Sequence, residues 1–186
     1  MSRARHASPP RWAVARAESS YNQHVTTFLS SSPEDTAALA AGLSDMAEGG
    51  DVLVLVGDLG AGKTAFSKAY GKTLGIDEPM TSPTFTLARE YEGRLKLHHL
   101  DVYRLEQMAE VLDLDLPDLL DSGGVVLIEW GDAILPMLPP DYLEVRFTFG
   151  EGDDDRSIEL RAVGDRWMNR AKAIASLCAS IGADPS

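Results

Sequence analysis

The sequence predicts an α/β domain in three layers, with helices on both faces of a mostly parallel central sheet and an inserted β-hairpin. Two unbroken aliphatic runs, Val52–Val56 and Val125–Ile128, are the first observation behind this prediction. Such runs are typical of strands that are buried on both faces, as in parallel sheets covered by helices. The second observation is a glycine-rich turn that directly follows the first run and precedes a helical pattern.

The segments before the first aliphatic run predict a strand and a helix. Residues Val25–Leu29 have the composition of a short strand. Ser32 is suited to cap the next helix, Pro33 then takes the first helical position, and two acidic residues follow. Apolar residues recur at helical spacing until Gly49 and Gly50, which are expected to end this helix.

The segments between the two aliphatic runs predict a helix, a hairpin and a second helical stretch. Thr64–Leu74 has a helical pattern that stops near Gly75. Side-chain types alternate over Phe85–Tyr91 and again over Leu95–His99, on either side of a Glu-Gly turn, as expected for a β-hairpin. Glu106–Leu120 is a short acidic helical stretch that a proline interrupts.

The last part of the chain predicts two strands and a helix. Apolar residues alternate over Leu143–Phe149, and Ile158–Ala162 repeats the pattern after an acidic turn. An amphipathic helix is expected from about Trp167 to Ile181. Cys178 lies on its apolar face, so we expect this thiol in the core, where burial raises its pKa.

Length and composition favour a single globular domain. The chain has 186 residues, of which 44% are hydrophobic, and its formal net charge is −12. A domain of this length buries enough surface to fold without a disulfide or metal, and the single cysteine fits a reducing, cytoplasmic location. The chain has no apolar run of about 18 residues, so no membrane span is expected. The acidic balance disfavours direct nucleic-acid binding.

Residues 1–21 are expected to form an N-terminal extension to a domain that covers residues 22–183. The first 20 residues contain four arginines and one acidic residue, and they lack the apolar block of a secretory signal. An arginine-rich, acid-poor start is compatible with a transit peptide, but the composition favours a disordered extension.

The glycine-rich turn "GDLGAGKT" predicts a phosphate-binding loop. Gly57, Gly62, Lys63 and Thr64 match the pattern G-x-x-x-x-G-K-S/T. Glycine lets the backbone approach a triphosphate closely, so that loop N–H groups and the start of the next helix bind phosphate oxygens. Lys63 is expected to bind the β- and γ-phosphates of ATP, and Thr64 to ligate Mg²⁺. The expected nucleotide contacts are Asp58, Leu59, Gly60, Ala61, Gly62, Lys63, Thr64 and Ala65.

Two acidic residues at predicted strand ends are candidates for the chemistry. Glu129 directly follows the second aliphatic run, where its carboxylate is placed to organise Mg²⁺ or to polarise an attacking water. Asp101 ends the second hairpin strand and is the candidate second acid. Both residues have a purely structural alternative, because acids at strand ends also cap the sheet or the following turn.

Thr84, in "SPTF", is the fourth catalytic candidate, after Lys63, Glu129 and Asp101. Loops in this position of P-loop enzymes often sense the γ-phosphate, and the alternative is a plain turn at the entry of a strand. His98 and His99 are adjacent, so they face opposite sides of a strand and are not expected to share a metal ion.

Two absences in the sequence bear on the reaction. The guanine-recognition motif N-K-x-D is missing, which favours ATP over GTP. Leu105–Gly124 contains no lysine or arginine, so the site lacks the cationic lid that small-molecule kinases usually place over the transferred group.

Four motifs occur in a fixed order: "GDLGAGKT", "SPTF", "HLDVYRL" and "LIEWG". Together they closely resemble the TsaE (YjeE) family of small bacterial P-loop ATPases, over about residues 25–150. The family patterns S-P-T-F/Y, H-x-D-x-Y-R and E-W are matched by Ser82, Pro83, Thr84, Phe85, His99, Asp101, Tyr103, Arg104, Glu129 and Trp130.

The resemblance implies a three-layer P-loop NTPase fold and a function. The family is required for the threonylcarbamoyl modification of adenosine 37 in tRNA, binds the heterodimer of TsaB and TsaD, and hydrolyses ATP to support repeated turnover. The implied partners are therefore TsaD and TsaB homologues, with tRNA reached indirectly. We predict a Mg²⁺-dependent ATPase of low intrinsic activity. The alternatives are a P-loop kinase of small molecules and a nucleotide-binding scaffold without significant hydrolysis.

Overall fold

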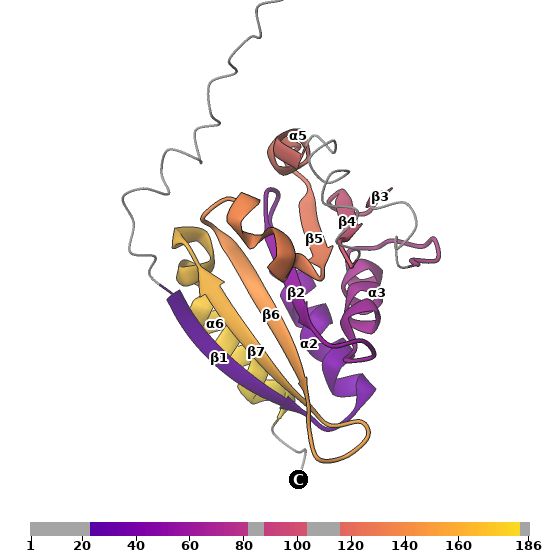
Figure 1. The fold of residues 1–186 in the computed structure, drawn as a ribbon, viewed down its shortest axis with the longest axis vertical. Coiled ribbons are helices and arrows are strands. Elements are labelled where there is room, and N and C mark those ends of the chain that lie inside the picture. Colours follow the sequence, from indigo (N-terminus) through magenta and orange to yellow (C-terminus); the bar gives the residue numbers. More distant parts are fainter. Residues whose placement is uncertain (1–22, 82–87, 104–115, 183–186) are drawn as a thin grey trace, which may run out of the picture.

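A computed structural model describes residues 23–81, 88–103 and 116–182 of the chain. These residues form one seven-stranded sheet in the order β1-β7-β6-β2-β5-β4-β3, with helices packed on it (Figure 1). The elements are β1 (Gln23–Ser30), α2 (Pro33–Asp45), β2 (Val52–Gly57), α3 (Lys63–Thr73), β3 (Ala88–Tyr91), β4 (Leu97–Asp101), α5 (Leu116–Asp121), β5 (Val125–Glu129), η2 (Gly131–Met137), β6 (Tyr142–Phe149), β7 (Arg156–Val163) and α6 (Asp165–Ile181).

The described sheet is mostly parallel, as predicted. β2 is parallel to both of its neighbours, β5 and β6, and β4 is parallel to β5. The pairs β6–β7, β7–β1 and β3–β4 are antiparallel, so β1 points the same way as β6 and only β3 and β7 run in the opposite direction. The predicted hairpin is β3–β4, but β4 is also an integral parallel strand, and β3 alone is added at the sheet edge.

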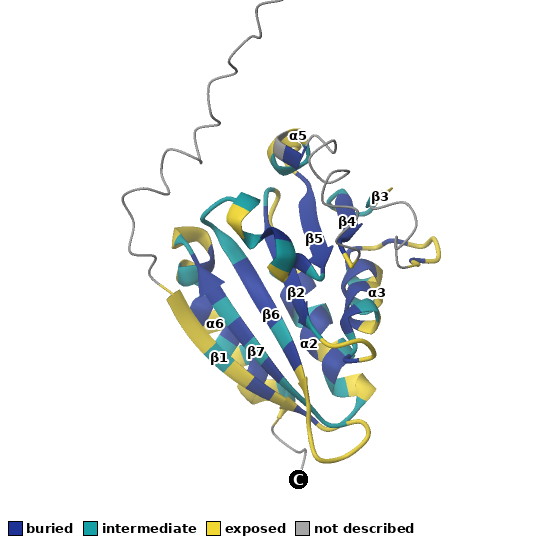
Figure 2. Ribbon diagram, in the orientation of Figure 1, coloured by how far each residue is buried: buried dark blue, intermediate teal, exposed yellow. Residues whose placement is uncertain are grey.

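Two apolar clusters on the two faces of the sheet make the three layers. Successive side chains of a strand point to opposite faces. In β2, Leu53 and Leu55 therefore belong to the cluster under α2, α3 and α6, whereas Val52, Val54 and Val56 belong to the cluster with η2 and α5. Both clusters are buried along β2 and β5, which explains why these strands are aliphatic throughout (Figure 2).

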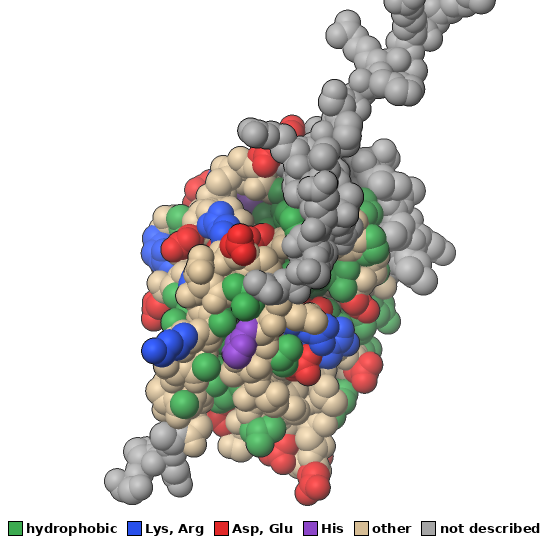
Figure 3. Space-filling model, turned by 90° about the vertical axis from the view of Figure 1, so that its left-hand side faces the viewer, with side chains coloured by type: hydrophobic (Ala, Val, Ile, Leu, Met, Phe, Trp, Pro, Cys, Tyr) green, Lys and Arg blue, Asp and Glu red, His purple; other side chains and the backbone are tan. Residues whose placement is uncertain are grey.

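The antiparallel part of the sheet has a different character. β1 forms one edge, and two of its apolar side chains, Val25 and Leu29, are exposed. On the molecular face that this edge occupies, apolar, acidic and basic side chains are interspersed (Figure 3). On the face of β6 and β7 that points away from α6, ion pairs join Glu144 to Arg146 and Glu159 to Arg161.

The parallel register places three strand ends side by side. Within the β4–β5 pair Asp101 is the register partner of Glu129, and within the β2–β5 pair Leu55 is the partner of Glu129. Ligands of open α/β sheets bind at the carboxyl ends of the strands. The loop after β2, the end of β4 and the end of β5 thus meet where a ligand site is expected.

Several expectations were refined by the structure. Cys178 is buried in the core as predicted, and burial raises the pKa of its thiol to about 11. The 3₁₀ helix η2 was not predicted. The N-terminal extension, the start of the first hairpin strand and most of Glu106–Leu120 lie outside the described residues, and α5 is the described end of that acidic stretch. Within the described ranges, no helix combines the length and apolarity needed to span a membrane.

Candidate functional site

The glycine-rich loop runs from the end of β2 to the start of α3, and its three glycines have positive φ angles. The values are 143° for Gly57, 81° for Gly60 and 112° for Gly62. A Cβ atom on Gly57 would lie 2.5 Å from the carbonyl oxygen of Phe147, so β6 excludes a side chain there. Gly60 and Gly62 have open space instead, and their φ angles alone demand glycine.

No side chain caps the first turn of α3. Gly62 is the N-cap and makes no side-chain cap, and the first turn contains no acidic residue. The first N–H groups of a helix have no intrahelical partner, and the helix dipole adds a partial positive charge. With the bare backbone of the loop beside it, this helix start is suited to an anion such as phosphate.

Lys63 is held in the loop by two carbonyl oxygens and one aromatic ring. Its Nζ donates to the carbonyl oxygens of Gly57 (2.6 Å) and Asp58 (2.8 Å), and lies 3.6 Å from the ring centroid of Trp130. Burial lowers the pKa of Lys63 and outweighs the charges of nearby carboxylates, of which Glu129 is the strongest, that raise it. The contacts with the two carbonyl oxygens and with Trp130 therefore fix the position of the Lys63 ammonium group beside the loop.

Trp130 owes its position beside Lys63 to an unusual backbone. It has φ 61° and ψ 29°, the left-handed conformation, which is uncommon for a bulky residue. Its N–H donates to the carbonyl oxygen of Leu55 (2.9 Å), which ties the chain to β2 as it leaves β5. The ring of Tyr103 lies against that of Trp130, with centroids 4.8 Å apart.

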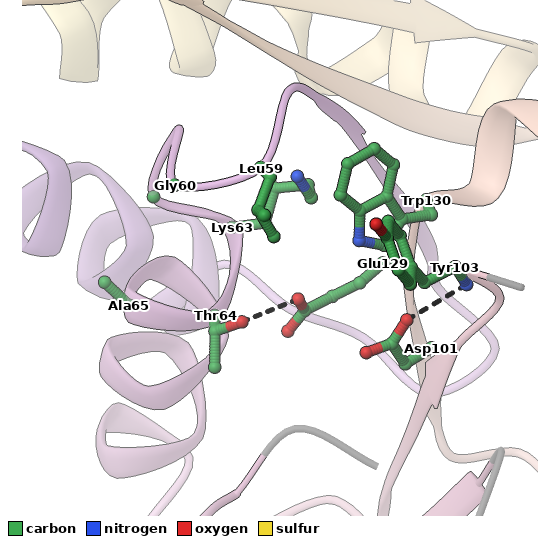
Figure 4. Close-up of a pocket in the computed structure, with 10 residues that line it drawn as sticks. Leu59, Gly60, Lys63, Thr64, Ala65, Asp101, Tyr103, Glu129 and Trp130 are labelled. Atoms are coloured by element: carbon green, nitrogen blue, oxygen red, sulfur yellow. Dashed lines mark hydrogen bonds between the residues drawn. The ribbon is translucent and has the colours of Figure 1, made fainter. Parts of the chain in front are cut away.

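Glu129 connects the loop, α3 and β4 through one buried carboxylate. Oε2 accepts a hydrogen bond from the Thr64 hydroxyl (2.8 Å), as drawn in Figure 4. Oε1 lies 2.8 Å from the Ser67 hydroxyl and 2.9 Å from Nε2 of His99. Burial raises the pKa of Glu129, whereas the hydrogen bond and charge of His99 and the hydrogen bonds of Thr64 and Ser67 lower it. The lowering effects are larger in sum, so the pKa of Glu129 lies below its usual value. Glu129 is therefore ionised and accepts all three bonds.

Asp101 lies across the pocket from Thr64, on the other side of Glu129 (Figure 4). Its Oδ1 accepts a hydrogen bond from the N–H of Tyr103 (3.1 Å), so the carboxylate also shapes the turn after β4. The structural alternative for Asp101 is thus observed, and it coexists with a position in the pocket.

An open pocket of about 370 Å³ joins these groups. It contains the predicted Lys63, Thr64, Glu129 and Asp101, together with four further loop residues. Two predicted loop residues do not line it, because Asp58 turns its carbonyl to Lys63 and Ala61 is buried. Thr84 lies outside the described residues. The lining consists of Leu59, Gly60, Gly62, Lys63, Thr64, Ala65, Asp101, Tyr103, Glu129 and Trp130.

Sequence reasoning assigned no role to five residues that shape this site. Trp130, Tyr103 and His99 belong to the family patterns, which was the available signal for them. Ser67 follows Lys63 by one helical turn, and such spacing places it on the same face of α3. Arg156 had no signal at all: its Nε donates to the carbonyl oxygen of Ala61 (3.1 Å) from the start of β7.

The donors around Thr64 suit a hard metal ion. The described residues include no group of three or more His, Cys, Asp or Glu side chains that could hold a metal by itself. His98 and His99 face opposite sides as predicted, with His98 against Ser122 and His99 against Glu129. What remains in the pocket is a hydroxyl and two carboxylates, the oxygen ligands that Mg²⁺ prefers when it is bound together with a phosphate.

Fold and site together define a P-loop domain of the three-layer α/β class. The family model "Threonylcarbamoyl adenosine biosynthesis protein TsaE" matches residues 30–158. The chain belongs to the TsaE family of threonylcarbamoyl adenosine biosynthesis proteins.

Individual relatives agree with this assignment. The TsaE proteins of Bacillus subtilis strain 168 and Nostoc sp. strain PCC 7120 are 46% and 43% identical to it, over 73% of this chain and 84% and 85% of theirs. The crystal structure of YdiB from Bacillus subtilis has a TM-score of 0.72 and 36% identity, and the match covers 84% of this chain and 98% of that one.

Proposed function

We propose that this protein is a Mg²⁺-dependent ATP hydrolase that supports threonylcarbamoylation of adenosine 37 in tRNA through nucleotide-dependent binding to a TsaB–TsaD complex in the cytoplasm. The observation that carries the proposal is the 2.8 Å hydrogen bond between Thr64 of the loop and Glu129 of β5. This bond joins the phosphate-binding motif to a buried, ionised acid. Binding phosphate does not require such an acid, whereas organising Mg²⁺ or an attacking water does.

ATP is bound by the loop amides, the start of α3 and the Lys63 ammonium. Lys63 has three N–H donors, of which two contact loop carbonyls, so a phosphate oxygen can take the third or displace one of them. Glu129, Asp101 and Asp58 place negative charge around Lys63. Free ATP is strongly anionic, and these carboxylates repel it, so we expect binding to depend on a divalent cation.

Thr64 and Glu129 fit Mg²⁺ bound together with the nucleotide. Thr64 gives its only hydroxyl proton to Glu129, which leaves the lone pairs of its oxygen for a cation. When bound, Mg²⁺ would neutralise charge that develops on the phosphates. Glu129 and Asp101 would hold its water ligands, and Glu129 is the residue best placed to orient the attacking water.

The expected reaction is slow in the isolated protein. P-loop hydrolases that lack a cation for the transition state turn over at roughly 10⁻⁴–10⁻² per second. Residues 105–124 contain no lysine or arginine, so we propose that the TsaB–TsaD partner supplies charge or orders the segment that contains Thr84, the proposed γ-phosphate sensor. The net charge of −12 supports contact with tRNA through that partner rather than directly.

Two measurements separate this proposal from the kinase and scaffold alternatives. Phosphate release is measured with and without TsaB–TsaD homologues, beside reactions that contain small-molecule acceptors. Partner affinity is then measured with ATP, with ADP and with no nucleotide. We expect faster hydrolysis with the partner and tighter association with ATP, since coupling between two ligands is reciprocal. Equal partner affinity in all three states contradicts the coupling, and rapid transfer to a metabolite identifies a kinase.

A further inference from the structure

The two oxygens of the Glu129 carboxylate have different surroundings. Oε1 meets two donors, the Ser67 hydroxyl at 2.8 Å and the His99 ring nitrogen Nε2 at 2.9 Å. Oε2 meets the Thr64 hydroxyl, which borders the pocket. Ser67 and His99 are fully buried, whereas Thr64 is part of the pocket lining, so one oxygen faces the interior of the protein and the other faces the site.

We propose that Ser67 and His99 are positioning residues that anchor Glu129 by Oε1, so that Oε2 is the oxygen that works in the pocket. This inference rests on the proposed hydrolysis and adds how its acid is oriented. A carboxylate rotates easily about its last torsion, for which the preferences are broad. Two buried donors on one oxygen remove that freedom before any ligand binds.

The two anchors come from different layers, which makes the arrangement rigid. Ser67 belongs to α3, and its single hydroxyl proton has two acceptors in reach, the carboxylate Oε1 of Glu129 at 2.8 Å and the carbonyl oxygen of Lys63 at 3.0 Å. The charged and nearer Oε1 is the stronger acceptor, so the proton is directed to Glu129. His99 belongs to β4, which pairs with β5, the strand that Glu129 ends. Because the ionised Glu129 is an acceptor, Nε2 of His99 carries the proton. Nδ1 has no hydrogen-bond partner among the described residues, so the contact with Glu129 is the polar contact that orients this ring.

The neighbouring histidine provides a matched control. His98 is also on β4 and also buried, but its Nε2 lies 2.9 Å from the Ser122 hydroxyl on the opposite face. A role of His99 in folding alone would be shared by His98, whereas a role in orienting Glu129 would not. Comparing the same substitution at both positions therefore separates stability from function.

The experiment measures kcat and ATP affinity of the full chain with its partner complex. His99→Asn is too short to reach Glu129, whereas His99→Gln can place an amide N–H near the position of Nε2. We expect kcat to fall about 10–100-fold in His99→Asn and Ser67→Ala, the range for residues that orient a site residue, with ATP affinity changed less than about 3-fold. His99→Gln should recover much of the loss, and His98→Asn should keep the wild-type kcat.

Three results would overturn the inference: wild-type kcat in His99→Asn, no recovery in His99→Gln, or an equal loss in His98→Asn. A second measurement does not depend on hydrolysis. NMR of the nucleotide-free protein should show His99 protonated at Nε2, with a proton shift that changes in Glu129→Gln. If the wild type hydrolyses no ATP but this signal is present, the proposed function fails and the anchor stands. If His99 is protonated at Nδ1 alone, the anchor fails whatever the activity.

Discussion

Two buried carboxylates lie at opposite ends of the central strands and have opposite surroundings. Asp51 directly precedes β2, and Glu129 ends β5; each is 1% exposed. Asp51 makes a two-pronged ion pair with Arg170 of α6, with N–O distances of 2.6 and 2.7 Å, and the ring of Trp167 covers that guanidinium. Glu129 is instead held by two hydroxyls and one histidine ring.

The two ends of the sheet therefore differ, with an ion pair at one end and the candidate site at the other. The guanidinium neutralises the charge of the carboxylate with which it pairs. Breaking such a buried pair costs folding free energy, because one charge is left buried without its partner. Glu129 has no guanidinium partner among the described residues, and the hydroxyls of Thr64 and Ser67 donate to it without bringing a charge, so the carboxylate is suited to attract a cation in the pocket. At the amino end of the parallel strands, the ion pair between Asp51 and Arg170 attaches α6 to the sheet. The candidate site lies at the carboxyl end.

Breaking the Asp51 pair should have the largest effect of all. Asp51→Asn leaves the largely buried Arg170 charged and without a carboxylate partner, with only the carbonyl oxygens of Met46 and Arg166 as acceptors. This loss costs about 3–5 kcal/mol of folding free energy. Urea unfolding measures this loss. Glu159→Gln is the matched control, because its pair with Arg161 is about one-third exposed and should contribute less than about 1 kcal/mol. A loss below that of the control would show that this end of the sheet is not fastened by the ion pair.

Glu129→Gln should show the reverse pattern, with most of the activity lost and a smaller loss of stability than in Asp51→Asn. The amide keeps the shape but not the charge, so hydrolysis in the presence of the partner should fall roughly 100-fold or more, the range for a lost general base. ATP affinity should change little, because Lys63 and the loop amides remain. Phosphate release and unfolding are measured on the same preparation. A variant that is less stable than Asp51→Asn but fully active would reverse the comparison.

Lys63→Ala should remove most of the stabilisation that ATP gives. At about 100 times the dissociation constant, a ligand adds roughly 2.7 kcal/mol, which raises the melting temperature by roughly 5–10 °C for a chain of this length. Thermal unfolding with and without Mg-ATP measures the rise. Lys72→Ala, in the last turn of the same helix, should keep it in full. An equal rise in both variants would exclude the loop as the ATP site.

His98 should give a small dependence of stability on pH. Burial lowers the pKa of His98 below its usual 6.5 and outweighs the carboxylate of Glu90, which raises it. The unfolded chain therefore binds this proton more tightly, so stability should decrease as pH falls through about 6.5 until the folded pKa is passed. His98→Gln should flatten this decrease in urea unfolding between pH 7.5 and 5.5. An unchanged slope would show that His98 titrates alike in both states.

The strands, the loop and the acids of the site could be predicted because each depends on local pattern. An aliphatic run indicates a strand buried on both faces, and parallel strands bring their last residues, Asp101 and Glu129, to one edge. The ring of Trp130 under Lys63 could not be derived in this way, since it depends on a left-handed residue between β5 and η2. The helix η2 itself is short and contains Pro136, so its sequence has no clear period.

The shape of the phosphate-binding loop depends on Arg156, which lies outside the loop motif. The eight residues of "GDLGAGKT" are contiguous, but the carbonyl oxygen of Ala61 accepts a hydrogen bond from Arg156, which lies 95 positions later in the chain. That arginine is itself fixed by the carbonyl oxygens of Asp153 and Asp155 in the turn between β6 and β7. Grafting β2, the loop and α3 onto another sheet would transfer every residue of the motif but not the hydrogen bond from Arg156 to Ala61.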